Sequence, residues 1–327
     1  MKLCVTGGTG FTGAALVQRL LEMGHDVVVL DKSPGIALES LKSRGAHIIF
    51  GSVTDQKAVK EAVAGCEVVF HLAAAFRELN VPDSVYREAN VEGTRIVAQA
   101  SLDAGARKLV YCSTQGVHGH IDNPPGDENS PIAPADYYQQ TKYEGELELP
   151  AFAEKGLEYT ILRPTAIYGP GDPGRFVMIY RRAKKGLFPM FGSGKTFYHP
   201  VYIENFVDAL ILAMASGVGA GQAYIIADEE YFSIQELVTR VGRSIGVDVK
   251  TPRYPIWPLI IAGHIFEKAY KPFGIAPPIF PRRVDWFRQV RAFRIDKAKR
   301  DLGYVPRVGI DEGLRLTGEW YIKEGYI

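Results

Sequence analysis

The sequence KLCVTGGTGFTG, at residues 2–13, contains the pattern that decides the fold. Its first five residues are those of a short buried strand, and an amphipathic stretch typical of a helix follows the glycine-rich turn. Gly7, Gly10 and Gly13 let the backbone turn tightly and approach a ligand closely, because no side chains intervene. The free N–H groups at the start of the following helix favour a negatively charged ligand. The segment therefore predicts a loop that binds the pyrophosphate of a dinucleotide.

Short apolar runs recur along the first half of the chain, at residues 26–31, 46–50, 67–72, 107–112 and 158–163. Helix-like stretches separate them, with long ones at residues 85–104 and 137–155; Pro150 is expected to kink or end the second. Nearly continuous apolar strands joined by helices are typical of a parallel sheet that is covered on both faces. We therefore expect an α/β protein whose residues 1–164 form a doubly wound parallel sheet, the Rossmann fold.

The second half of the chain, residues 165–327, alternates less regularly. We expect it to form a smaller C-terminal α/β part that binds the substrate, with some segments returning to the core. Residues 233–246 predict a capped helix. The apolar segment 256–266 is too short to span a membrane, and we expect it to be buried in the core; a lid or a surface-seeking helix is the alternative. It lies in a proline-dense stretch, residues 252–281.

Composition indicates an intracellular protein that acts on small molecules. The 327 residues are 46% hydrophobic, enough for a substantial core, and 38 basic against 37 acidic residues leave a net charge of +1. So small a charge attracts neither nucleic acid nor an anionic membrane surface. The three cysteines form no CxxC pair, and the first apolar run ends at Gly7, so we expect a reducing, cytoplasmic location without a leader. We expect no nucleic-acid partner, integral membrane segment or metal site.

The choice of dinucleotide depends on Asp31, which ends the second strand 18 residues after Gly13. A carboxylate there accepts hydrogen bonds from the ribose hydroxyls and repels a 2′-phosphate, which favours NAD over NADP. Lys32 is a neighbouring cation that could tolerate the extra phosphate.

A candidate acid–base group lies in the second long helix. Tyr138 and Lys142 are four residues apart, so both side chains point to one side of the helix. A nearby cation lowers the pKa of a phenol towards the range that an acid–base catalyst needs. Thr114 follows the fifth strand at the carboxyl edge of the sheet, where such folds place their chemistry, and its hydroxyl can hold a substrate oxygen. Thr114, Tyr138 and Lys142 are therefore the predicted catalytic residues.

The whole chain resembles the extended short-chain dehydrogenase/reductase superfamily, through TGGTGFTG, Asp31, HLAAA at 71–75, Asn90, Thr114, Tyr138, Lys142 and RPTAIYGPGD at 163–172. The resemblance implies a homodimer in which Tyr138 is the acid–base, Lys142 its activator and Thr114 a hydroxyl donor to the substrate. The cofactor contacts expected on this basis are Gly7, Gly10, Phe11, Thr12, Gly13, Asp31, Lys32, Ser52, Val53, Leu72, Ala73, Ala74, Tyr138, Lys142, Pro164 and Ile167. The expected substrate contacts are Ala75, Thr114, Gln115, Tyr138, Thr165 and His199.

The chain departs from the superfamily pattern at Ser52, Cys112 and His118, where aspartate, serine and tyrosine are frequent. The aspartate contacts adenine, so the departure at Ser52 bears on the adenine contacts.

Two substrate classes compete within the superfamily. One is the apolar secondary alcohol of the 3β-hydroxysteroid dehydrogenase-like branch, a sterol or a long-chain hydroxy or keto acid, and the other is the nucleotide sugar of a 4-epimerase. Asn205 and Phe197 stand where sugar epimerases often have aspartate and arginine, which favours the first class. Apolar segments such as 256–266 suit an apolar substrate as well. A basic cluster could instead hold substrate phosphates: Arg175, Arg181, Arg182, Lys184 and Lys185.

Other activities fit the sequence less well. A 4,6-dehydratase needs an acidic pair after Thr114, where this chain has Gln115 and Gly116. A protein that senses NAD without turnover has no need of Thr114, Tyr138 and Lys142 together. We therefore expect an NAD-dependent oxidoreductase that interconverts a secondary alcohol and a ketone on an apolar substrate.

Overall fold

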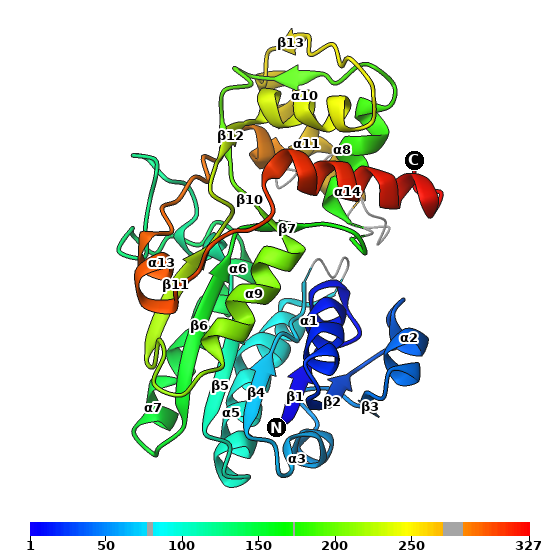
Figure 1. The fold of residues 1–327 in the computed structure, drawn as a ribbon. Helices are drawn as coiled ribbons and strands as arrows, with labels where there is room; N and C mark the ends of the chain where they lie inside the picture. Colours follow the sequence, from blue (N-terminus) through cyan, green and yellow to red (C-terminus); the bar gives the residue numbers. More distant parts are fainter. Residues whose placement is uncertain (77–80, 173, 271–283) are drawn as a thin grey trace.

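The computed structural model describes residues 1–76, 81–172, 174–270 and 284–327. At its centre is a seven-stranded parallel sheet in the order β11-β6-β5-β4-β1-β2-β3 (Figure 1). Its strands are β1 Lys2–Thr6, β2 Asp26–Asp31, β3 His47–Phe50, β4 Val68–His71, β5 Lys108–Cys112, β6 Glu158–Pro164 and β11 Gln222–Ile226. The doubly wound α/β fold is confirmed, and each of the six predicted strands lies within one residue of its predicted bounds.

The sheet is buried on both faces, which explains its nearly continuous apolar strands. In β1, Leu3 and Val5 join one core cluster and Cys4 joins the other, on the opposite face. Helices α1 (Phe11–Glu22) and α9 (Ile203–Ala213) contact one another and belong to the first cluster. Helices α3 (Gln56–Val63) and α5 (Gly93–Asp103) belong to the second cluster. Figure 1 shows the two layers, and the short helix α2 (Leu38–Ser43) lies beside α1.

The direction of winding reverses between β1 and β4. From β1 the chain builds β2 and β3 on one side, and it then returns to place β4 on the other side of β1. In parallel sheets of this kind, ligands bind outside the carboxyl ends of the strands at such a reversal. The glycine-rich turn leaves β1 at this point.

The two long helices that we predicted are each interrupted. The first consists of α4 (Asp83–Arg87), a π-helical turn η1 (Glu88–Glu92) and α5. The second consists of α6 (Tyr137–Glu148) and α7 (Pro150–Ala153), with Pro150 in the first turn of α7. Pro150 therefore ends the long helix, as predicted, because proline lacks the N–H that would continue the hydrogen-bond ladder.

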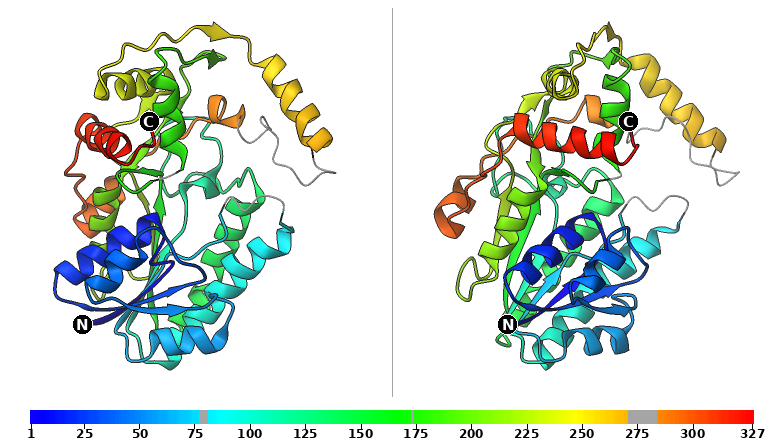
Figure 2. Two further views of the ribbon diagram at one scale, coloured as in Figure 1. Left: turned by 90° about the vertical axis from the view of Figure 1, so that its right-hand side faces the viewer. Right: turned by 45° about the vertical axis from the view of Figure 1, so that its right-hand side comes forward.

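The second half of the chain contributes to both ends of the molecule. Strand β11 joins the sheet beside β6, and α9 and α13 (Asp296–Leu302) pack near it. The remaining elements gather beyond the carboxyl ends of the sheet strands (Figure 2). They are the strand pairs β7 (Ala166–Tyr168) with β10 (Pro200–Tyr202), β8 (Met190–Phe191) with β13 (Arg253–Tyr254) and β9 (Phe197–Tyr198) with β12 (Phe232–Ser233), and the helices α8 (Arg175–Ala183), α10 (Ile234–Ser244), α11 (Trp257–Tyr270), η4 (Asp285–Phe287) and α14 (Ile310–Lys323). Ser233 caps α10 by accepting from the Glu236 N–H, which confirms the predicted capped helix.

The expectation that residues 256–266 are buried in the core is wrong. All of them except Ile256 lie in α11, where Trp257, Ile261 and Ile265 are 64%, 51% and 59% exposed. The reason is that α11 leaves the body after β13 (Figure 2), and no other described element packs extensively against it. Residues 271–281 of the proline-dense stretch lie outside the described residues. No helix in the described ranges has the length and apolarity that crossing a membrane requires.

Candidate active site

The glycine-rich turn is packed so closely that side chains would not fit. Gly7 has φ +70°, and a Cβ atom there would lie 2.9 Å from the backbone of Ala73, across the gap between β1 and β4. A Cβ atom on Gly13 would lie 2.1 Å from the Gly7 carbonyl oxygen. Gly10 is exposed at the N-cap of α1, and no side chain caps the helix there. The turn therefore presents the uncapped start of α1 at the reversal of the sheet, as a pyrophosphate site requires.

Asp31 is held in place at the carboxyl end of β2 by Thr9. Its Oδ2 atom accepts hydrogen bonds from the Thr9 N–H at 3.0 Å and the Thr9 hydroxyl at 2.7 Å. Gly35 packs closely against Thr9: a Cβ atom at position 35 would lie 2.0 Å from the Thr9 carbonyl oxygen. Both hydrogen bonds use Oδ2, and Oδ1 has no hydrogen bond with any other described residue.

A buried chain of hydrogen bonds fixes the backbone after β4. The Ala73 N–H donates to the Thr6 hydroxyl at 3.2 Å, and Thr6 lies 2.7 Å from His71 Nδ1. His71 Nε2 lies 3.1 Å from the Thr94 hydroxyl, which donates to the Asn90 carbonyl at 2.7 Å. The Thr94 hydroxyl donates its proton to the Asn90 carbonyl, so it can only accept from His71. Nε2 of His71 therefore carries the hydrogen and donates to Thr94, and Nδ1 accepts from the Thr6 hydroxyl. Burial lowers the pKa of His71 to about 3, so its ring is neutral.

Asn90 continues this scaffold from the π-helical turn η1. Its Oδ1 accepts from the Ala75 N–H at 2.8 Å, and its Nδ2 donates to the Ala75 carbonyl at 3.2 Å and to the Thr141 hydroxyl at 3.0 Å. Asn90 therefore ties residues 73–75 to α6, the helix that carries the predicted acid–base pair.

Tyr138 and Lys142 lie one turn apart on α6, in different surroundings. Tyr138 is half-buried in the first turn, with its ring 4.9 Å from that of Phe76. Lys142 is fully buried, and its ammonium lies 4.0 Å from the centre of the Tyr111 ring. Among the described residues the Lys142 Nζ has no hydrogen-bond partner. Burial lowers the pKa of Lys142 from its usual 10.5 to about 8.

Thr114 lies beside the first turn of α6. It is the N-cap of the short 3-10 helix η2 (Gln115–His118), and its hydroxyl accepts from the Gly116 N–H at 3.0 Å. A Cβ atom on Gly116 would lie 2.8 Å from the Gln139 side chain, so η2 touches α6 closely. The structure thus brings the element with Thr114 against the helix turn with Tyr138.

Polar atoms without partners point to a ligand at this place. Among the described residues, Gln115 Oε1 and Thr165 Oγ1 are buried without a hydrogen-bond partner, as is Lys142 Nζ. Thr165 follows β6 and Gln115 follows β5, which are neighbours in the sheet. Since buried polar atoms normally find partners, these three fit the hydroxyl and amide groups of a bound dinucleotide or substrate.

The other predicted cofactor residues lie along the carboxyl edge of the sheet or just after it. Phe11 and Thr12 begin α1, Lys32 is exposed after β2, Ser52 and Val53 follow β3, Leu72 and Ala74 follow β4, Pro164 ends β6 and Ile167 lies in β7. Ser52, one of the predicted departures from the superfamily pattern, lies 2.7 Å from the Thr54 hydroxyl. Asp55 caps α3.

A buried ion pair beneath the acid–base helix escaped the sequence analysis. Arg163 Nε and Nη2 donate to the two carboxylate oxygens of Glu146 at 3.0 and 2.5 Å, and the Ser113 hydroxyl donates to Glu146 at 2.5 Å. Arg163 Nη1 also donates to His118 Nε2 at 3.0 Å. Burial and the Arg163 charge lower the pKa of His118, so its ring is neutral. One feature of the sequence does indicate that Glu146 faces inward. It lies four residues after Lys142, and therefore on the same face of the helix.

His199 lacks the free nitrogen that the predicted substrate contact needs. Its Nε2 lies 2.9 Å from the Asp228 carbonyl, and its Nδ1 accepts from the Phe293 N–H at 3.3 Å. Both nitrogens are therefore used within the protein. Asn205 is likewise buried, and its side-chain amide bonds to Asp228 at 2.7 Å and to the Arg307 N–H at 2.9 Å.

The basic cluster considered for substrate phosphates lies elsewhere. Arg181, Arg182, Lys184 and Lys185 are exposed at the C-terminal end of α8. The side chain of Arg175 lies outside the described ones. The cluster therefore gives no support to a phosphate site.

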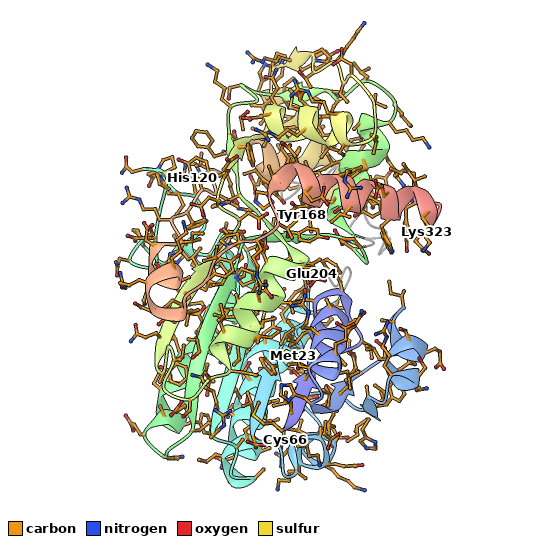
Figure 3. The ribbon with its side chains drawn as sticks, in the orientation of Figure 1. Met23, Cys66, His120, Tyr168, Glu204 and Lys323 are labelled. Atoms are coloured by element: carbon orange, nitrogen blue, oxygen red, sulfur yellow. The ribbon has the colours of Figure 1, made fainter. Side chains whose placement is uncertain are left out.

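A cavity of about 310 Å³ adjoins the glycine-rich turn between α1, α2 and α9. The charged groups in its lining are all paired: Arg19 forms ion pairs with Glu204 and with Asp208, and Glu22 pairs with Arg44. Figure 3 labels Glu204 on α9, at the side that faces α1.

Comparisons with known proteins agree with this geometry. Residues 3–227 match the model of the NAD dependent epimerase/dehydratase family. The chain is 33% identical to 3beta-hydroxysteroid-dehydrogenase/decarboxylase isoform 1 of Arabidopsis thaliana, covering 96% of this chain and 78% of that protein. It is also 33% identical to 2-alkyl-3-oxoalkanoate reductase of Stenotrophomonas maltophilia, covering 96% and 98%. The solved structure of UDP-glucose 4-epimerase from Thermotoga maritima superposes with a TM-score of 0.78 at 26% identity, covering 99% of each chain.

Proposed function

Because the chain belongs to the NAD dependent epimerase/dehydratase family, we propose that it interconverts a secondary alcohol and a ketone on an apolar substrate. The substrate class is a sterol-like molecule or a long-chain hydroxy or keto acid. NAD is the cofactor, as in the family, and the enzyme is an extended short-chain dehydrogenase/reductase.

The observation that carries the substrate class is the contact between Phe76 and Tyr138. An exposed phenylalanine ring 4.9 Å from the acid–base ring places an apolar wall next to the reacting atoms. The described cations of α8 are exposed at its C-terminal end, and no contact that the structure shows among the described residues directs them towards Tyr138. The names of the steroid dehydrogenase and oxoalkanoate reductase relatives support the same class.

The residues of this chain would divide the chemistry as follows. Bound NAD accepts or returns a hydride. Tyr138 takes the hydroxyl proton of the alcohol and returns it to the ketone. Thr114 holds the same oxygen through its hydroxyl. Lys142, one turn from Tyr138, places its charge so that the phenolate is favoured, and its unpartnered ammonium can also bind the nicotinamide ribose.

A substrate screen tests the proposal. The purified chain with NAD is given a 3-hydroxysterol, a long-chain 3-hydroxy acid and UDP-glucose, and absorbance of free NADH at 340 nm is followed. The proposal predicts NADH with a sterol or hydroxy acid and none with UDP-glucose. Turnover of UDP-sugars alone would overturn it.

A nucleotide-sugar 4-epimerase with tightly held NAD is the second candidate. The close superposition on UDP-glucose 4-epimerase along the whole chain favours it. Such an enzyme converts UDP-glucose to UDP-galactose without releasing NADH, so chromatography of the sugar products distinguishes it from the dehydrogenase.

We also propose a cytoplasmic homodimer. All three cysteines are free in the structure, which is compatible with a reducing compartment. Light scattering during size-exclusion chromatography measures the oligomeric state.

A further inference from the structure

Two features have no part in the active site, namely the basic cluster at the end of α8 and the exposed apolar helix α11. The pairing of β8 with β13 brings them together. The Phe188 N–H donates to the Lys250 carbonyl at 2.9 Å, and the Gly192 N–H donates to the Tyr254 carbonyl at 2.9 Å. Residues 186–192, directly after the basic cluster, therefore run beside residues 248–254, and α11 begins three residues later. Figure 2 shows β13 and α11 at the end of the molecule far from the sheet.

The apolar side chains of α11 form a continuous stripe. Trp257, Ile261 and Ile265 follow one another at four-residue intervals, so they share one face of the helix, and each is more than half exposed. Leu187 and Tyr254, from the paired segments, are nearly half exposed as well. Contiguous apolar surface of this kind marks a place of contact with another apolar body.

The two paired segments, together with α11, are strongly basic. Residues 181–195 and 248–270 contain eight basic and two acidic residues, a net charge of +6 in a chain whose total is +1. The basic side chains are all exposed: Arg181, Arg182, Lys184, Lys185, Lys195, Lys250, Arg253 and Lys268. The acidic residues are Asp248 and Glu267, and on the neighbouring α10 Glu236 is paired with Arg240. The near-zero total charge of the chain therefore conceals a local positive field.

We propose that this basic–apolar face, residues 181–195 with 248–270, docks on an anionic lipid bilayer. An apolar helix face with tryptophan, joined to segments rich in lysine and arginine, combines the two attractions by which a protein holds to the interface of such a membrane. A second copy of the chain is a poor occupant, because two faces that each carry +6 repel one another. The docking goes beyond the proposed reaction and does not depend on it.

Vesicle binding tests the proposal on the full chain. Co-sedimentation is measured with vesicles of phosphatidylcholine alone and of phosphatidylcholine with about 30% phosphatidylglycerol. We expect binding to the anionic vesicles, at least about tenfold weaker binding to the neutral ones, and release at high salt. In a chain that carries Trp286→Phe and Trp320→Phe, the fluorescence of Trp257 should shift to shorter wavelength in the bound state.

Substitutions locate the contact. Ile261→Asp should weaken binding to anionic vesicles about tenfold or more, and Lys184→Glu with Lys185→Glu should do the same. Val305→Asp is the matched control, because Val305 is 63% exposed outside this face, and it should bind as the unaltered chain does. Circular dichroism shows whether each variant is folded, and NADH formation with soluble substrate should stay unchanged in all of them.

Two results would overturn the docking proposal. One is the absence of binding to anionic vesicles, or binding that Ile261→Asp leaves unchanged. The other is a dimer in solution that Ile261→Asp, but not Val305→Asp, dissociates, since the stripe would then be a protein interface. A failure of the proposed dehydrogenase reaction appears in the substrate screen and leaves the vesicle result unaffected.

Discussion

Replacing Lys142 by methionine should stabilise the protein without cofactor while abolishing its activity. Burial lowers the pKa of Lys142 from 10.5 to about 8, and its ammonium has no hydrogen-bond partner among the described residues. At about 1.4 kcal/mol per pKa unit, holding this charge below pH 8 costs the folded state about 3 kcal/mol. The variant also loses the contact between the ammonium and the Tyr111 ring. This loss reduces the stabilisation by about 1 kcal/mol. We therefore expect a net stabilisation of about 2 kcal/mol at pH 7.

The free energy of unfolding should increase with pH because of Lys142. Between about pH 8 and 10.5 the unfolded chain keeps the Lys142 proton and the folded chain releases it, so the free energy of unfolding rises with pH. The unaltered protein should gain about 3 kcal/mol across this window relative to Lys142→Met. Urea unfolding from pH 7 to 10.5, compared between the two proteins without NAD, measures this difference.

Lys108→Met is the matched control for this experiment. Lys108 is also buried, but its ammonium donates to the Ala215 carbonyl at 3.0 Å and to that of Val218 at 2.5 Å. Its removal takes the Lys108 donor from the Ala215 carbonyl and leaves the Val218 carbonyl with the Thr160 hydroxyl alone, and it should destabilise the protein by about 1–3 kcal/mol. Should Lys142→Met destabilise the protein as much as Lys108→Met does, or show the same pH profile as the unaltered chain, the reasoning about an unpaired buried charge is refuted.

Two further substitutions test the cofactor site and the buried ion pair. Asp31→Ser removes the carboxylate held by Thr9, and it should raise the KM for NAD about tenfold while improving the use of NADP. The measurement is the ratio of kcat/KM for NAD to kcat/KM for NADP. An unchanged ratio would contradict the assignment of Asp31 to the ribose. Arg163→Met leaves Glu146 buried without its cation and should cost about 3–5 kcal/mol in urea unfolding, of which the double variant with Glu146→Gln recovers part. Equal stability of the Arg163→Met variant and the unaltered chain would show that the pair does not hold α6.

Much of the fold could be predicted because its sheet is buried on both faces. Six strands appear in the sequence as apolar runs, and the catalytic candidates follow those runs at the carboxyl edge. The burial of α11 was predicted wrongly, because apolar composition indicates a need for cover and does not show what supplies it.

The missed parts of the site depend on contacts between distant residues. Charged residues such as Glu146 and Arg163 are normally expected at the surface. Only the folded structure shows that they are buried together, where they form an ion pair between α6 and β6. The two ring nitrogens of His199 are hydrogen-bonded to the backbone of Asp228 and Phe293, which are 29 and 94 residues away along the chain. No local pattern reveals such partners.

The most direct test of the account compares Tyr138→Phe with the unaltered enzyme, on a substrate found in the screen. Removing the phenolic hydroxyl should lower kcat by about a thousandfold, because the proton of the alcohol loses its acceptor. The Kd for NAD, measured by calorimetry, should stay within about twofold, since the glycine-rich turn and Asp31 are untouched. A Tyr138→Phe enzyme that turns over at the unaltered rate would contradict the central claim that this phenol moves the proton.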